Sequence, residues 1–243
     1  MAKTAVCRLN LGMVNAFLLE SGGNAVLVDS GYPGSDIASR LDALGLEADQ
    51  PRLALVTHAH SDHFGGLPGL LALRPDLKVA VGEADAEGLA LGIDVDLEPL
   101  GQRGRLAARL TGTGRQNDGG QPRATGRGIK ADLLFQGGES LALYGMDATI
   151  LATPGLTRGS LSVFIEDAEG RDGRPLGPVA IVGDLVMGGF VMKKRPSPPF
   201  FASGMDELRS SLAILKDLGA KTLFTGHGGP LDADRVFRKF GLH

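Results

Sequence analysis

Short apolar runs separated by glycine-rich turns make up the amino-terminal part of the chain, a pattern typical of strands. Apolar runs at 16–20 and 25–29 flank a Ser-Gly-Gly-Asn turn at 21–24, which predicts a β-hairpin. A continuous apolar run at 53–57 predicts a buried strand that leads directly into a cluster of histidines. Further runs of this kind predict strands at 78–81, 148–152, 161–166, 179–182 and 222–225.

Apolar residues at helical spacing predict three helices between these strands. The first covers 35–44, and another begins at about 67, directly after the histidine cluster. The clearest covers 205–218, where Ser203 is placed to cap the start and Gly219 to stop the end. Strands that alternate with helices predict a mixed α/β sheet protein.

Residues 101–130 differ from the rest of the chain in composition. The segment holds eight glycines, six arginines and one lysine but only one acidic residue, so its net charge is +6 in a chain of net charge −3. It shows no apolar periodicity, and we interpret it as a glycine-rich basic insertion. Two roles are open: a solvated linker, which the composition favours, or a basic lid beside the active site.

Overall composition is that of an ordinary globular protein. Hydrophobic residues make up 43% and charged residues 22% of the 243 positions, which excludes wholesale disorder and a fibrous chain. A net charge of −3 and a pI of about 6.0 disfavour nucleic acid and acidic membranes as partners. The single cysteine, Cys7, excludes an intramolecular disulfide, and neither an export signal nor a membrane span is visible. We therefore expect a cytoplasmic protein that acts on a small molecule, and its oligomeric state is open.

Three of the five histidines fall within six residues, at the end of the strand predicted at 53–57. This cluster contains His58, His60, Asp62 and His63. In an extended or tightly turning segment these imidazoles and the carboxylate can converge on a cation. Imidazole and carboxylate together are the ligands of zinc and of non-haem iron or manganese, so the cluster predicts a metal site.

The order His-x-His-x-Asp-His resembles the hallmark of the metallo-β-lactamase superfamily. Other segments match that family as well: Asp29 lies in an early Asp-containing turn, Asp184 follows a glycine after an apolar run, and His227 lies between two glycines. The resemblance covers nearly the whole chain. It implies a single metallo-hydrolase domain over 1–243 with an αββα four-layer sandwich, and an active site at one edge of the sheets.

The resemblance also implies roles for six metal ligands: His58, His60, Asp62, His63, Asp184 and His227. Asp62, His63 and His227 are expected to hold one metal ion, and His58 and His60 help to hold a second, while Asp184 bridges the two. Asp29 is expected to support the site from outside. We further assign Asp62 a catalytic task as proton acceptor or shuttle beside the activated water. Zinc, as one or two ions, is the expected cofactor, and iron or manganese are alternatives.

One position departs from the family pattern. Members usually carry Thr-Pro-Gly-His-Thr-x-Gly-Ser, whereas this chain has Leu156 in place of the histidine within 153–160. Leucine offers no donor atom, so the position held by His58 and His60 loses its third imidazole. Either that position binds iron or weakly held zinc, or the site holds one metal. The carboxy-terminal His243 is a poor replacement because chain termini fray.

Two metals bridged by a carboxylate activate water and polarise a carbonyl or phosphoryl oxygen, so the expected reaction is hydrolysis. The absence of a cysteine near Asp184 disfavours the β-lactamase branch that uses one, and the sixteen residues after His227 disfavour a typical glutathione thioesterase. The acidic net charge disfavours the nuclease branches. A small ester or lactone remains the preferred substrate. Three other hydrolases are alternatives: a thioesterase, a phosphoesterase and a β-lactam hydrolase. Two further alternatives are a metal-binding protein with weak or lost catalysis because of Leu156, and a mononuclear iron oxygenase.

The segment 190–201 is a candidate wall for the substrate. Phe190, Met192, Phe200 and Phe201 make it apolar, and its prolines stiffen it, so it either packs against an acyl chain or only covers the core. The basic run at 193–195 either attracts a carboxylate or keeps the loop soluble.

Overall fold

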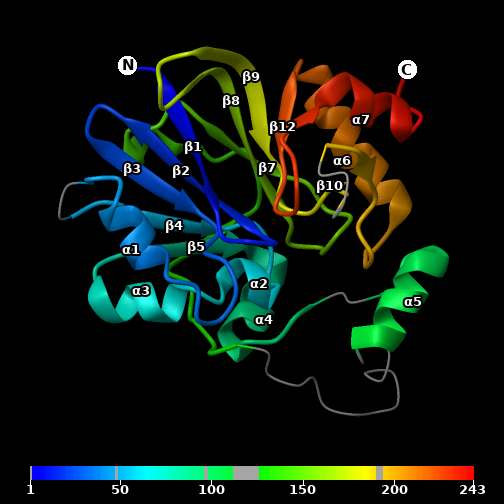
Figure 1. The fold of residues 1–243 in the computed structure, drawn as a ribbon, viewed down its shortest axis with the longest axis horizontal. Helices are drawn as coiled ribbons and strands as arrows, with labels where there is room; N and C mark the ends of the chain where they lie inside the picture. Colours follow the sequence, from blue (N-terminus) through cyan, green and yellow to red (C-terminus); the bar gives the residue numbers. More distant parts are fainter. Residues whose placement is uncertain (1, 47–48, 96–97, 112–125, 190–193) are drawn as a thin grey trace.

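A computed structural model describes residues 2–46, 49–95, 98–111, 126–189 and 194–243 of the chain (Figure 1). The amino-terminal half of the fold is a set of strands in the order β1-β2-β3-β4-β5-β6. The first three strands pair antiparallel, and the strands from β3 to β6 pair parallel. The bounds of these strands are β1 (Thr4–Asn10), β2 (Asn15–Ser21), β3 (Asn24–Val28), β4 (Leu53–Val56), β5 (Lys78–Gly82) and β6 (Leu133–Phe135).

The carboxy-terminal half continues the hydrogen-bonded order as β8-β9-β12-β13, with β7 also paired with β8. β1 and β8 pair in parallel and thereby join the two halves. β10 and β11 form a separate small hairpin. The bounds are β7 (Thr149–Ala152), β8 (Leu161–Gly170), β9 (Pro175–Ile181), β10 (Met187–Gly188), β11 (Pro196–Ser197), β12 (Thr222–Phe224) and β13 (Leu231–Asp232).

Helices lie on the outer faces of both halves, and α1 and α3 lie on the opposite side of the molecule from α6 and α7 (Figure 1). The described residues also form the short 3-10 helices η1 (Glu83–Asp85), directly after β5, and η3 (Leu141–Tyr144), before β7. The α-helices are α1 (Ile37–Asp42), α2 (Ser61–Phe64), α3 (Leu67–Leu73), α4 (Ala86–Leu91), α5 (Gly101–Thr111), α6 (Met205–Asp217) and α7 (Ala233–Lys239). Within the described ranges, no helix has the length and apolar character that a membrane crossing requires.

Three apolar clusters show that the fold has four layers. The middle cluster joins residues from both sets of strands, such as Phe17 of β2 and Ile181 of β9. A second cluster packs the amino-terminal strands against α1, α2 and α3, and a third packs the carboxy-terminal strands against α6 and α7. Successive residues of β2 alternate between the middle cluster and the outer one, because side chains alternate across a strand. This arrangement confirms the predicted αββα sandwich.

Local predictions agree with most of these elements. The predicted hairpin is present, with Phe17 opposite Val28, and the predicted helix at 205–218 is α6. The helix ends as predicted before Gly219, which has a φ of 75°. The predicted cap is wrong: Gly204 is the N-cap, and the Ser203 hydroxyl donates to Glu207 instead. Ser203 lies one residue too early, because the first hydrogen bond of the helix runs from the amide of Leu208 to the carbonyl of Gly204.

Residues 101–111 correct the interpretation of the basic insertion as a loop, because they form helix α5. Arginine, leucine and alanine dominate this stretch, and all three are strong helix formers, a signal that outweighs the missing apolar periodicity. The amide of Leu100 donates to the carbonyl of Phe200, which ties the start of α5 to the segment before α6. Residues 112–125, which hold much of the predicted insertion, lie outside the described residues.

Candidate metal centre

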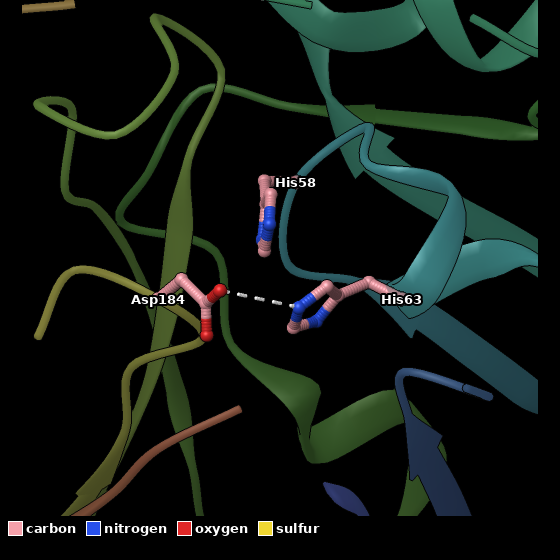
Figure 2. Close-up of side chains that lie close together, drawn as sticks. All are labelled: His58, His63 and Asp184. Atoms are coloured by element: carbon pink, nitrogen blue, oxygen red, sulfur yellow. Dashed lines mark ion pairs between the residues drawn. The ribbon is translucent and has the colours of Figure 1, made fainter. Parts of the chain in front are cut away.

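Loops that follow three strands meet at one edge of the fold. His58 and His63 follow β4, Asp184 follows β9 and His227 follows β12. β9 and β12 are parallel neighbours, so their carboxyl ends open at the same edge, which is where α/β folds place ligand sites. Figure 2 shows the side chains of His58, His63 and Asp184 around a common centre, each approaching from a different direction.

Two overlapping groups of side chains at this edge have the composition and spacing of a metal site. The first contains His58, His63 and Asp184, and the second contains Asp62, His63 and His227. Within each group, one ligand atom from each residue lies within 4.8 Å of the others. His63 belongs to both groups. Five of the six ligands selected from the sequence are therefore brought together.

Several polar atoms of the first group are buried without a hydrogen-bond partner. These atoms are Nε2 of His58, Nε2 of His63 and Oδ1 of Asp184. Leaving a buried polar atom unpartnered is costly, so native proteins rarely do so without a compensating ligand. Two imidazole nitrogens and a carboxylate oxygen are the donors that zinc and similar ions prefer. The residues present therefore fit a transition-metal ion.

A buried carboxylate, that of Asp29, determines which ring nitrogen donates a hydrogen bond in two of these histidines. Asp29 Oδ2 lies 2.8 Å from Nδ1 of His63 and also accepts the Thr57 hydroxyl at 2.8 Å. Because the Thr57 hydroxyl gives its proton to Asp29, it accepts from Nδ1 of His58, which is 3.0 Å away. Both histidines thus use Nδ1 as a donor, and Nε2 is left with a lone pair for the metal.

Asp29 is also the single non-glycine residue with positive φ in the described part of the chain, at 60°. Aspartate tolerates this left-handed conformation better than most residues, although it is still strained. The Thr57 amide donates to Asp29 Oδ1 at 2.8 Å and helps to hold the turn in place. The predicted supporting turn is therefore present, and it contacts His63 directly.

His227 is oriented in the same way by a backbone carbonyl. Its Nδ1 lies 2.9 Å from the carbonyl oxygen of Met13, so Nε2 faces the carboxylates. Nε2 of His227 lies 3.0 Å from Asp62 and 3.2 Å from Asp184. The β1–β2 turn therefore helps to position the last ligand of the sequence motif.

The family model described as the metallo-beta-lactamase superfamily matches residues 9–227. The chain belongs to this superfamily. The match covers β4, β9 and β12 and all six residues selected as ligands.

Relatives of this superfamily member are similar along most of its length. It is 28% identical to the uncharacterized protein YobT of Bacillus subtilis, over 88% of this chain and 83% of that protein. It is 26% identical to the human acyl-coenzyme A thioesterase MBLAC2, over 92% of this chain and 76% of that protein. The solved structure of a β-lactamase from Chitinophaga pinensis has a TM-score of 0.63 at 23% identity, covering 93% of this chain and 77% of that one, which shows a shared fold.

Electrostatics keep both carboxylates of the metallo-β-lactamase site ionised. Burial opposes ionisation of Asp184, but His227 and His63 outweigh it and hold the pKa of Asp184 well below its usual value. The pKa of Asp62 is also lowered, because His63 and His227 outweigh the effect of burial. Both side chains are therefore anionic at neutral pH, as metal ligands must be.

The pKa values of the histidines at this site are shifted in opposite directions. Burial, assisted by the neighbouring His63 and His60, holds the pKa of His58 well below its usual value, so its ring is neutral. Burial also opposes protonation of His227, but Asp184 and Asp62 outweigh it and raise the pKa to about 10. The carboxylates raise the pKa of His63 in the same way. A cluster that favours positive charge this strongly also favours a metal cation, which displaces these protons when it binds.

His60 lies beside this cluster but outside both groups. Its ring centroid is 4.6 Å from that of His58, and its Nε2 lies 2.7 Å from the carbonyl oxygen of Val95. Because Nε2 donates to Val95, Nδ1 keeps the lone pair. Its expected role as a ligand stays a prediction.

Leu156 occupies the motif position where a histidine is usual, and it is buried, with 3% of its surface exposed. Its carbonyl accepts the amide of Ser203, just before α6. The carbonyl of His243 accepts Lys216, near the opposite end of that helix. His243 therefore lies near the end of α6 opposite to the Leu156 contact, and it belongs to neither candidate ligand group among the described residues.

Sequence analysis missed two acidic residues that hold the ligand loops. Asp85 is fully buried and accepts the amides of Ala59 and Gly159 at 2.8 and 2.9 Å. Asp94 accepts the amide of Ser61 at 2.6 Å, at the start of the helix that carries Asp62 and His63. Isolated acids outside a motif carry no local signal, although Asp85 comes soon after a buried strand.

Proposed function

We propose that this superfamily member is a metal-dependent hydrolase that cleaves a small ester or lactone. The observation that carries the proposal is the convergence of buried atoms of His58, His63 and Asp184 that have no hydrogen-bond partner. Zinc is the expected ion, and the donor set also suits iron or manganese. The two overlapping groups can hold one or two ions.

A transition metal held by these residues supplies a nucleophile at neutral pH, by lowering the pKa of water, and polarises a substrate carbonyl. The protein's own side chains orient this chemistry. Asp62 is suited to accept a proton because its side chain is 37% exposed, whereas that of Asp184 is 8% exposed. His227 holds Oδ2 of Asp62 at 3.0 Å, and Oδ1 lies 4.0 Å from Nε2 of His63, so both oxygens face the candidate metal centre in a fixed orientation. Asp184 is enclosed by His63 and His227 and serves as a ligand.

The proposal is tested on protein purified without chelator. Elemental analysis is expected to detect zinc, iron or manganese, and reconstitution is expected to raise the melting temperature because the ligands are assembled only in the folded state. Activity is then measured on a lactone, a 4-nitrophenyl ester, acetyl-coenzyme A, a β-lactam and a phosphoester. Protein that contains no metal, takes none up on reconstitution and hydrolyses no substrate contradicts the proposal.

A thioester is the second candidate substrate. It is supported by the similarity to MBLAC2, an acyl-coenzyme A thioesterase, over 92% of this chain. Hydroxyacylglutathione hydrolase of Erwinia tasmaniensis is also 28% identical, over 60% of this chain and 41% of that protein. Oxygen esters and thioesters both present a carbonyl to the same activated water, so relative kcat/KM on the ester and on acetyl-coenzyme A decides between them.

Leu156→His tests whether the leucine limits the site. The added imidazole lies on the loop that follows β7 and offers a further donor for the position held in part by His58. We expect metal occupancy to rise toward two ions and kcat/KM to rise about tenfold, as restored ligation of this kind is worth that much. Metal content and esterase rates of both forms give the answer. Unchanged occupancy with lower activity would show that the site is adapted to leucine.

A further inference from the structure

A cavity of about 390 Å³ adjoins the segment that carries His227 and is bordered by β1, the β1–β2 turn and the loops after β10 and β12. Met13 lines the cavity, and its carbonyl accepts His227 Nδ1. Gly228 and Gly229, which directly follow His227, line it as well. The backbone that positions a candidate metal ligand is thus also a wall of this cavity.

The charged side chains that line the cavity are both cationic. Arg8 reaches it from β1 and Lys194 from the segment before β11, and no acidic residue is among the described residues that line it. Neither cation forms an ion pair with a carboxylate in the part of the chain that the structure describes. Two uncompensated cations in one cavity of a protein with net charge −3 indicate a site for an anion.

Arg8 is held in place at the cavity wall. Its Nη1 donates to the carbonyl oxygen of Gly229 at 3.0 Å. A guanidinium has five N–H groups, so this contact orients the side chain and leaves further donors for a ligand. Guanidinium groups pair with carboxylate and phosphate through two parallel hydrogen bonds, and an ammonium adds a point charge. The volume is sufficient for such a group on a small substrate.

We propose that this cavity binds an anionic group of the substrate, a carboxylate or a phosphate, while the ester bond lies at the metal centre. The inference rests on the proposed hydrolase function and narrows its substrates to anionic esters. Arg8 and Lys194 are the specificity-determining residues.

The test compares two 4-nitrophenyl esters of equal length, one that ends in a carboxylate and one that ends in a neutral amide. For the double variant Arg8→Gln/Lys194→Gln, KM for the carboxylate ester is expected to rise about tenfold or more, with kcat little changed. KM for the amide ester is expected to stay the same. Arg40→Gln, which removes an exposed arginine on α1, is the matched control for loss of charge. KM for acetyl-coenzyme A, measured on wild type and the double variant, gives the corresponding comparison for a substrate that carries phosphate.

A KM that rises only for the carboxylate ester, or only for acetyl-coenzyme A, identifies which anion the cavity takes. If KM for neither anionic substrate changes while both esters are hydrolysed, the anion site is wrong and the proposed function stands. If no ester is hydrolysed, the proposed function fails, and calorimetric titration of the metal-loaded protein with glutarate tests the cavity directly. Equal affinity of wild type and double variant for glutarate then overturns the site.

A second inference comes from hydrogen bonds around Asp85. Besides the amides of Ala59 and Gly159, its carboxylate accepts the Thr157 hydroxyl at 2.8 Å. Ala59 lies between two histidines of the motif, and Thr157 directly follows Leu156, so one carboxylate joins the two loops. The two segments are closely packed, because a Cβ on Gly159 would lie 2.5 Å from the amide nitrogen of Asp85.

The geometry points to Asp85 as a positioning residue that holds the Leu156 loop against the histidine loop. A histidine at this motif position would tie the loop to the metal, and Leu156 has no donor atom, so the hydrogen bonds of Asp85 supply the connection. The inference concerns the shape of the site and not the identity of its substrate.

Thr157 supplies a matched pair of variants. Thr157→Val removes the hydroxyl at nearly constant volume, and Thr157→Ser keeps it. We expect Thr157→Val to weaken cobalt(II) binding about tenfold and to change the visible spectrum of the bound cobalt, and Thr157→Ser to resemble wild type. Asp132→Asn is the control, because Asp132 accepts the amide of Val79 and so joins β5 to the chain before β6, outside both candidate ligand groups. A lower melting temperature for Thr157→Val with unchanged cobalt affinity and spectrum would show that the contact stabilises the fold but does not position the metal site.

Discussion

His63→Ala is expected to lower kcat/KM for the hydrolysed ester by about 10³-fold or more. His63 belongs to both candidate ligand groups, and its Nε2 is one of the buried atoms without a hydrogen-bond partner. Metal chemistry supplies several kcal/mol to such a reaction, and about 1.4 kcal/mol corresponds to a factor of ten in rate. Steady-state kinetics and metal content, measured on the same preparation, check the prediction.

His243→Ala is the matched control, because it removes the exposed carboxy-terminal histidine. Its metal content and rate are expected to equal those of wild type. Because removal of a buried ring also destabilises the fold, His63→Gln, which keeps more of the side-chain volume, is measured in parallel. Full activity in folded, metal-loaded His63→Ala would contradict the site assignment.

Asp29→Asn is expected to weaken zinc binding by about 10–100-fold while the protein remains folded. The asparagine keeps the shape of the side chain but offers one acceptor oxygen where the carboxylate serves three donors, from the Thr57 amide, the Thr57 hydroxyl and His63. One donor is then left without an acceptor, which costs about 1–3 kcal/mol of stability. Competition with a chromophoric chelator measures zinc affinity, and thermal unfolding measures stability.

The same substitution at Asp132 provides the comparison. Asp132 also accepts a backbone amide, that of Val79, but contacts neither candidate ligand group. We expect a loss of stability without a loss of zinc affinity. Equal zinc affinity in Asp29→Asn and wild type would show that orientation of His63 by Asp29 does not contribute to binding.

The candidate ligand groups could be predicted in large part from sequence because their signals are local. His58, Asp62 and His63 lie within six residues at the end of a buried strand, and the pattern of these residue types identifies the family without any knowledge of long-range contacts. Asp184 and His227 each follow an apolar run that forms a strand, so their placement at a sheet edge follows from strand prediction.

Other features gave no local signal. Helix α5 has few large apolar residues, and Ser203 was chosen as a cap from residue type although the N-cap lies one residue later, at Gly204. Asp85 joins two loops separated by nearly a hundred residues. Contacts of this kind depend on how the strands pair, and the type of a single residue carries no information about that pairing.

Sequence alone thus determined which residue types are available to hold a metal, and in which loops they lie. Tertiary structure decided which nitrogen of each ring donates a hydrogen bond and which keeps its lone pair. The acceptors that make this choice, for His63, His60 and His227, come from positions 34, 35 and 214 residues away in the chain. A ring nitrogen that donates a hydrogen bond cannot bind a metal, so the chemistry of each histidine depends on a partner that only folding brings into contact.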